Sequence, residues 1–182
     1  MTRIALTFIG RDRSGIIAEV TKILYEVGGN IEDTTMTILE GEFAMILIAL
    51  LPGRNAEVKA KKAFGRLQSK WGLNCFAKEI SGEVSKGEKH PSDVTTHIIS
   101  VAGRDRTGIV YETSRILAKH QLNITDLNSK ILGAGKKSVF TMILEVDIPK
   151  HFNTKKLEPD WQRLRKRLGL DVSVRPLERL AL

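Results

Sequence analysis

Hydrophobic residues recur along the chain with two different spacings. An alternating segment over residues 3–9 predicts a strand with Ile4, Leu6 and Phe8 on one face. Helical spacing follows over residues 16–27, and two glycines after it provide a stop. The first half of the chain therefore begins with a strand and an amphipathic helix.

The rest of the first half predicts two further strands, a second helix and a closing strand. Residues 31–39 and 43–51 have strand character on either side of a turn at Glu40-Gly41. An incomplete apolar stripe ends at Trp71-Gly72, and residues 73–78 form a short last strand. The order β-α-β-β-α-β predicts an α+β, ferredoxin-like unit in which two helices cover one face of an antiparallel sheet.

The second half of the chain repeats the first. The segment joining the first strand to the first helix occurs twice with six of eight positions identical, as Gly10-Arg11-Asp12-Arg13-Ser14-Gly15-Ile16-Ile17 and as Gly103-Arg104-Asp105-Arg106-Thr107-Gly108-Ile109-Val110. Matching residues of the two copies are 93 positions apart before the predicted hairpin near residues 132–137 and 97 positions apart after it, because the second copy is four residues longer there. We therefore expect two copies of one domain, residues 1–79 and 95–180, joined by a polar linker over residues 80–94.

Composition excludes several classes of protein. Hydrophobic residues make up 42% of the 182 residues and charged residues 27%, which is typical of globular domains. No apolar run approaches the ~20 residues that span a bilayer, and the first residues lead into a strand, so we expect a cytoplasmic protein. The single cysteine, Cys75, and the scattered histidines give no metal-ligand spacing, so we expect neither metal nor cofactor.

The net charge of +8 falls mainly in the second half, where residues 91–182 carry 16 Lys and Arg against 10 Asp and Glu. A solvated helix face is one interpretation of this charge, and an anionic partner such as nucleic acid or an acidic protein surface is the other. The basic residues concerned are Lys155, Lys156, Arg163, Arg165, Lys166 and Arg167.

The repeated Gly-Arg-Asp-Arg-Ser/Thr-Gly-Ile segment, with Asn-Ile-x-Asp opening the next strand, resembles the ACT domain. A tandem pair with little else is similar to the glycine cleavage system transcriptional repressor family, and the resemblance spans nearly the whole chain apart from the linker. It implies a non-enzymatic sensor that binds an amino acid such as glycine where two ACT domains meet. It also implies a protein partner such as a transcription factor, and a homodimer is compatible with it.

The residue types in the repeated turn suit a zwitterion. Free N–H groups at the start of a helix attract a carboxylate, a glycine there leaves room, an Asp accepts from the ammonium group, and an Asn adds a polar contact. The candidate ligand-binding residues are Gly10, Arg11, Asp12, Arg13, Ser14, Gly15, Ile16, Asn30 and Asp33 in the first copy, and Gly103, Arg104, Asp105, Arg106, Thr107, Gly108, Ile109, Asn123 and Asp126 in the second.

Each candidate also has a purely structural interpretation. Asp and Ser or Thr at these positions are good N-caps, and the cap is favoured for Ser14 and Thr107. The first glycines suit a turn, the asparagines suit left-handed backbone, and the arginines suit an exposed surface as well as an acidic ligand group.

The sequence also bears on functions other than amino-acid sensing. The sequence has no nucleophile with a matched base and no nucleotide-binding loop, so we expect no enzyme active site. Two alternatives remain beside the sensor. One is nucleic-acid binding through the basic second helices, and the other is a structural module that oligomerises through a sheet edge formed by Ala44–Leu51.

Overall fold

The computed structural model of the chain describes residues 1–53, 55–80, 91–135 and 138–177. The chain divides into two compact units, Met1–Gly87 (unit 1) and Glu88–Leu182 (unit 2), and each has its own sheet and core. Most of the predicted linker, residues 81–90, and the predicted end of the second domain, residues 178–180, lie outside the described residues.

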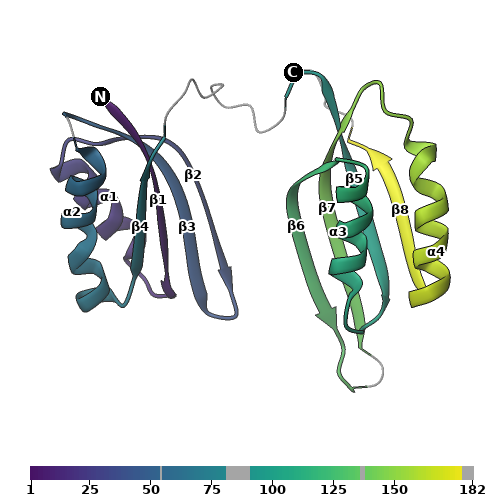
Figure 1. Ribbon diagram of the computed structural model, residues 1–182. Helices are drawn as coiled ribbons and strands as arrows, with labels where there is room; N and C mark the ends of the chain where they lie inside the picture. Colours follow the sequence, from purple (N-terminus) through teal and green to yellow (C-terminus); the bar gives the residue numbers. More distant parts are fainter. Residues whose placement is uncertain (54, 81–90, 136–137, 178–182) are drawn as a thin grey trace. The chain divides into compact units, whose positions relative to one another are not determined.

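Both units have the predicted order of elements (Figure 1). Unit 1 consists of β1 (Thr2–Arg11), α1 (Ile16–Glu26), β2 (Asn30–Leu39), β3 (Glu42–Leu51), α2 (Ala56–Trp71) and β4 (Asn74–Glu79). Unit 2 consists of β5 (Val94–Arg104), α3 (Ile109–Lys119), β6 (Asn123–Leu132), β7 (Val139–Pro149), the 3-10 helix η2 (Thr154–Leu157), α4 (Glu158–Leu168) and β8 (Leu170–Pro176). The extra length of the second copy falls between β6 and β7, as predicted.

Each sheet is antiparallel, with strand order β2-β3-β1-β4 in unit 1 and β6-β7-β5-β8 in unit 2. Alternation along β1 directs Ile4, Leu6 and Phe8 toward the helices, and all three are fully buried. Both helices of a unit cover the same face of its sheet (Figure 1). The prediction of two ferredoxin-like units of the α+β class is confirmed.

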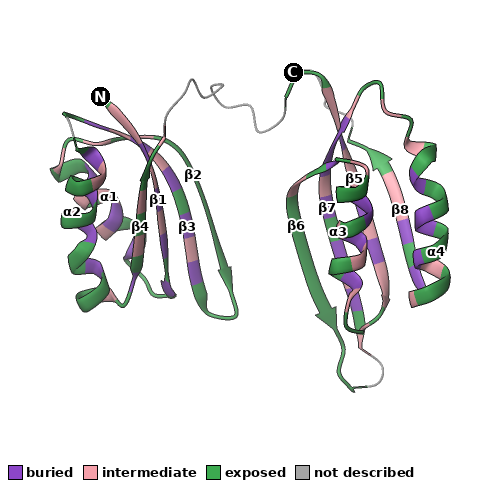
Figure 2. Cartoon of the chain, viewed as in Figure 1, coloured by how far each residue is buried: buried purple, intermediate pink, exposed green. Residues whose placement is uncertain are grey.

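The segment Ala44–Leu51 does not form a sheet edge. It belongs to β3, which is hydrogen-bonded to β1 on one side and to β2 on the other. The prediction of an edge was wrong because long aliphatic runs are typical of inner strands, whose backbone groups are already paired. The outer strands are β2 and β4, and β2 is exposed along nearly its whole length (Figure 2).

The two cores differ in side-chain size at equivalent positions. In unit 1 the rings of Phe8 and Phe64 meet edge to face, with centroids 5.0 Å apart. The offsets of 93 and 97 place Val101 and Trp161 at these positions in unit 2, and Trp161 is 1% exposed. A smaller strand residue thus accompanies a larger helix residue, as close packing of a core requires.

Candidate functional site

The repeated turns have nearly the same backbone in both units. Gly15 and Gly108 have φ of 93° and 96°, a left-handed conformation that favours glycine, and each is the N-cap of its helix. The first helical bonds run from Glu19 N to Gly15 O, 3.0 Å, and from Glu112 N to Gly108 O, 2.9 Å. Three N–H groups ahead of each of these bonds therefore have no acceptor within the helix.

The capping interpretation of Ser14 and Thr107 is wrong. Each lies one residue before the glycine that caps the helix, so neither occupies the N-cap position. Among the described residues, the hydroxyls of Ser14 and Thr107 and the carboxylates of Asp12 and Asp105 have no hydrogen-bond partner. The sequence was misleading because Ser, Thr and Gly can all serve as caps, and only the backbone decides among them.

The turns are also tied to the following hairpin through the backbone. Asp12 N donates to Gly41 O at 2.8 Å, and Asp105 N donates to Ser138 O at 3.2 Å. The side chains of Ile16 and Ile109, predicted as ligand-binding residues, are each 2% exposed and belong to the cores. They can therefore reach a ligand only through their N–H groups.

Gly10 and Gly103 are strand residues, so their interpretation as turn residues is wrong. A Cβ on Gly10 would lie 2.6 Å from Gly72 O, and one on Gly103 would lie 2.7 Å from Leu170 Cδ2 and 3.0 Å from Gly169 O. The connection after the second helix crosses the strand closely in both units. These two glycines are explained by close packing.

In unit 1 a side chain of the protein already contacts the turn. The Arg13 guanidinium lies over the Trp71 ring, 4.4 Å from its centroid, and Arg13 Nη2 donates to Lys70 O at 3.0 Å. A Cβ on Gly15 would lie 3.2 Å from the same ring. The Arg13 side chain is thus held against the end of α2.

In unit 2 the equivalent turn is more open. Leu168 takes the position of Trp71, and a Cβ on Gly108 would meet nothing within 4 Å. Arg104 and Arg106, like Arg11 in unit 1, make no side-chain hydrogen bond or ion pair within the described part of the chain.

The predicted strand-opening residues lie far from the turn of their own unit. Asn30 pairs with Leu50, which pairs with Arg3, so Asn30 is level with the start of β1. Asp12 follows the other end of β1, nine residues away, or roughly 30 Å at about 3.4 Å per residue. Asp33, Asn123 and Asp126 are likewise at the far ends of their sheets. Within one unit, an Asn and the turn are therefore too far apart to contact the same small ligand.

The left-handed interpretation of these asparagines is also wrong. The positive φ falls on Gly28 in unit 1, 72°, and on the equivalent Gln121 in unit 2, 58°. Asn30 and Asn123 are already strand residues. Asp126 accepts a hydrogen bond from Asn128 Nδ2 at 2.8 Å, so it has a partner of its own.

A feature that the sequence did not indicate is a groove between the two helices of each unit. The α1–α2 groove of unit 1 has a volume of about 670 Å³ and the α3–α4 groove of unit 2 about 500 Å³. Five Lys or Arg and two acidic side chains line each groove. The sequence indicated that the second helices are basic, but the groove forms only where two helices that are distant in the sequence pack side by side, which is a tertiary feature.

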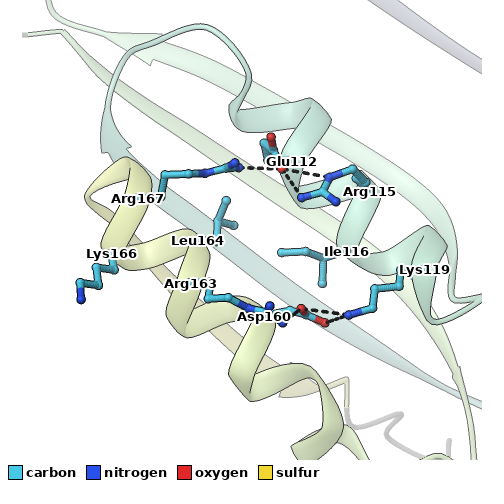
Figure 3. A pocket seen from close by; sticks show the side chains of 9 residues that line it. All are labelled: Glu112, Arg115, Ile116, Lys119, Asp160, Arg163, Leu164, Lys166 and Arg167. Carbon is cyan, nitrogen blue, oxygen red and sulfur yellow. Dashed lines mark hydrogen bonds and ion pairs between the residues drawn. The ribbon is translucent and has the colours of Figure 1, made fainter.

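In unit 2 the groove holds a buried carboxylate (Figure 3). The Asp160 side chain is 11% exposed and accepts from Lys119 Nζ at 3.0 Å, from His120 Nε2 at 2.9 Å and from Arg163. The hydrogen bonds from His120 and Lys119 lower the pKa of Asp160 to about 2. Asp160 is therefore ionised at any physiological pH.

The described residues offer little redox or metal chemistry. Burial raises the pKa of the Cys75 thiol to about 11, which keeps it protonated and unreactive at neutral pH. No group of three or more His, Cys, Asp and Glu within the described ranges is arranged to hold a metal ion. None of the helices described combines the length and apolar character needed to cross a membrane.

Comparison with known proteins identifies the family. The model of the ACT domain matches residues 2–78 and 95–175, one match in each unit. This chain belongs to the ACT domain family. Its two ACT units therefore account for most of its length, as the resemblance of the repeated turn implied.

Relatives and solved structures agree with this assignment. A UPF0237 protein of Pyrobaculum aerophilum is 37% identical over 78 residues, 42% of this chain and 82% of that protein. A UPF0237 protein of Methanopyrus kandleri is 41% identical over 68 residues, 37% of this chain and 73% of that protein. These relatives are similar in length to a single ACT unit.

Two crystal structures match across both ACT units. An unknown protein from Galdieria sulphuraria has a TM-score of 0.80 and 24% identity, covering 97% of this chain and 99% of that one. A candidate glycine cleavage system transcriptional repressor has a TM-score of 0.70 and 19% identity, covering 98% of each chain. At these identities the structures show that the tandem fold is shared.

Proposed function

We propose that this chain is a non-enzymatic regulator that senses an amino acid and acts through a protein partner. The observation that carries the proposal is the repeated turn of each ACT unit. It combines a left-handed glycine, helix N–H groups without an acceptor in the helix, and an aspartate that has no side-chain partner among the described residues. Two observations support a role in controlling the transcription of genes for amino-acid metabolism. They are the family membership of the chain and the tandem fold that it shares with a candidate glycine cleavage system repressor.

The ligand carboxylate would accept from the N–H groups at the start of the helix, where the dipole also favours an anion. The ammonium group would donate to Asp12 or Asp105 in a charge-assisted hydrogen bond. Both contacts lie within one turn of one unit. The turn thus offers complementary partners for the two charges of an amino acid.

Asn30 and Asn123 would contact such a ligand only from a second ACT unit. Within one unit they lie at the opposite end of the sheet from the turn. The turn of one unit and the Asn of another could contact one ligand only if two ACT units meet. We therefore propose that the ligand is held where two ACT units meet, in one chain or in a homodimer.

Calorimetry of the full chain against each of the twenty amino acids tests the proposal. We expect saturable binding of glycine or a small number of others. Asp105→Asn should weaken binding about 10- to 100-fold, because a hydrogen bond to a charged group contributes about 1.5–3 kcal/mol. Asp12→Asn should weaken it less, since Arg13 and Trp71 crowd the turn of unit 1.

Asp93→Asn is the matched control, because this exposed aspartate precedes β5 at the other end of the sheet from the unit 2 turn. It should bind like the unaltered chain. Binding of none of the amino acids, or equal binding by Asp105→Asn and the unaltered chain, would contradict the proposal.

A further inference from the structure

The α1–α2 groove of unit 1 is strongly basic and has cations without partners. Five Lys or Arg side chains line it, against Glu19 and Glu26. Among the described residues, the side chains of Lys62, Arg66 and Lys70 make no ion pair and no hydrogen bond. Each of these three side chains is exposed.

These three cations form a line along α2. They are spaced four residues apart, so a rise of 1.5 Å per residue separates neighbours by about 6 Å along the helix axis. Residues spaced in this way lie on one face of a helix. An anionic partner would therefore meet a regular row of positive charges.

The equivalent groove of unit 2 carries its own anions (Figure 3). Asp160 binds Lys119 and Arg163, and Glu112 Oε2 lies 2.7 Å from both Arg115 Nη2 and Arg167 Nη2. Four of the five cations of this groove, all except Lys166, thus form ion pairs with two acids of the same unit.

A single position explains much of the difference between the grooves. The offset of 97 places Ala63 of unit 1 at the position of Asp160, and Arg66 at the position of Arg163. Unit 1 keeps the arginine and lacks the carboxylate that unit 2 supplies internally. Asp160 shows where a carboxylate can bind between such helices.

We propose that the α1–α2 groove of unit 1 docks an acidic, amphipathic helix of a partner protein. Glu or Asp at four-residue intervals on such a helix repeat every 6 Å or so, which matches the row of Lys62, Arg66 and Lys70. Its apolar stripe would pack on Ile23 and Val27, which are half-buried between the two helices.

The lining of the groove favours a helix over single-stranded nucleic acid. Proteins that bind single strands stack the bases on aromatic side chains, and the residues lining this groove include no aromatic one. The groove supplies a surface for the protein partner of the proposed function. It shares no residue with the ligand-binding turn, so the two proposals can fail separately.

The test uses the full chain and a labelled 18-residue synthetic peptide with three Glu at four-residue intervals beside a Leu stripe. Fluorescence anisotropy should show saturable binding to one site. Arg66→Glu should weaken binding at least tenfold, and Lys62→Glu provides a second variant should the first fold poorly. Lys78→Glu, an exposed reversal of charge on β4, is the matched control and should bind normally.

Ala63→Asp gives the sharpest test, because it installs in unit 1 the carboxylate that pairs with Lys119 and Arg163 in unit 2. It should weaken peptide binding at least fivefold, whereas Ala63→Asn, of the same size without charge, should bind nearly as the unaltered chain does. Equal loss in both variants overturns the proposal, since it would indicate a steric effect.

Two further outcomes also overturn it. One is equal binding of a scrambled peptide of the same composition. The other is tighter binding of a 15-nucleotide single-stranded RNA that depends on Arg66. Peptide binding should persist in Asp12→Asn and Asp105→Asn. If the chain binds the peptide but no amino acid, the docking proposal is supported and the sensor proposal is contradicted.

Discussion

The two ACT units keep the same backbone at the turn and differ in the side chains beside it. The glycines before the first helices have φ within 3° of each other, at 93° and 96°. Beside them, unit 1 has the Arg13 and Trp71 contact, and unit 2 has Leu168 and an open glycine. The two units therefore share the backbone conformation of the turn and differ in how open it is.

Polar groups are distributed differently in the two units. Among the described residues, unit 1 leaves three cations of its groove unpaired, whereas unit 2 pairs four of its five groove cations with two acids and also buries polar side chains such as Thr96 and Thr113. The two proposals consequently assign the stronger amino-acid site to unit 2 and the partner surface to unit 1. Substitutions at equivalent positions can test this division.

The largest effect is expected for a feature that both units share, the glycine near the end of the first strand. Gly10→Ala and Gly103→Ala should each lower the free energy of unfolding by about 1–3 kcal/mol, because an added Cβ overlaps packed neighbours. The loss should be larger for Gly10, whose nearest neighbour is the Gly72 carbonyl oxygen, than for Gly103, which meets the end of a Leu side chain. Urea unfolding combined with hydrogen exchange measures this loss of stability in each unit.

Gly65→Ala is the matched control for this pair. Gly65 is exposed within α2, and a Cβ there would meet nothing within 4 Å. Alanine should stabilise the helix by up to about 1 kcal/mol. A Gly10→Ala protein as stable as the Gly65→Ala protein would show that the close strand crossing is not a constraint.

The fold could be predicted from the sequence because its signals are local and repeated. Alternation in β1, helical spacing in α1 and the glycine at position 72 each act over a few residues, and the second copy gave an independent reading of the same order. The edge at Ala44–Leu51 could not be predicted in this way. Strand order depends on pairing between distant segments, which the pattern within one strand does not specify.

The site was less predictable for the same reason. The motif located the turns, but it could not reveal that Trp71 folds back onto one of them or that Asn30 lies at the far end of the sheet. Asp160 was missed because an aspartate in the first turn of a basic helix is common on exposed surfaces. Its burial depends on α3, which is distant in the sequence.

A second, smaller effect should distinguish the two units by how their stability responds to acid. The pKa of Asp160 is about 2, below its ordinary value of 3.8, so its contribution to stability is present above about pH 4 and is lost as the pH falls toward 2. We expect unit 2 to lose about 1–2 kcal/mol over this range, reduced from the full shift because Lys119 and Arg163 are largely exposed.

Urea unfolding at pH 6 and pH 2.5 measures this loss, and Asp160→Asn is the matched variant. Asparagine should lower stability at pH 6 and make unit 2 less sensitive to acid, leaving only the contribution of Glu112 and other carboxylates. Unit 1, with Ala63 at this position, provides the internal comparison. An acid response of unit 2 that is unchanged in Asp160→Asn would show that the buried carboxylate is not its source.

The smallest effect concerns the cores, where Thr113 of unit 2 stands at the position of Val20 in unit 1. Thr113 is fully buried, and its hydroxyl has no hydrogen-bond partner among the described residues. Thr113→Val keeps the shape and removes the unpaired group, so unit 2 should gain roughly 1 kcal/mol, the lower end of the cost of such a group. The reciprocal Val20→Thr should destabilise unit 1 by a similar amount, as urea unfolding can measure. If Thr113→Val instead destabilises unit 2, the hydroxyl has a partner such as a buried water, and the polarity of this core is a structural feature rather than a cost.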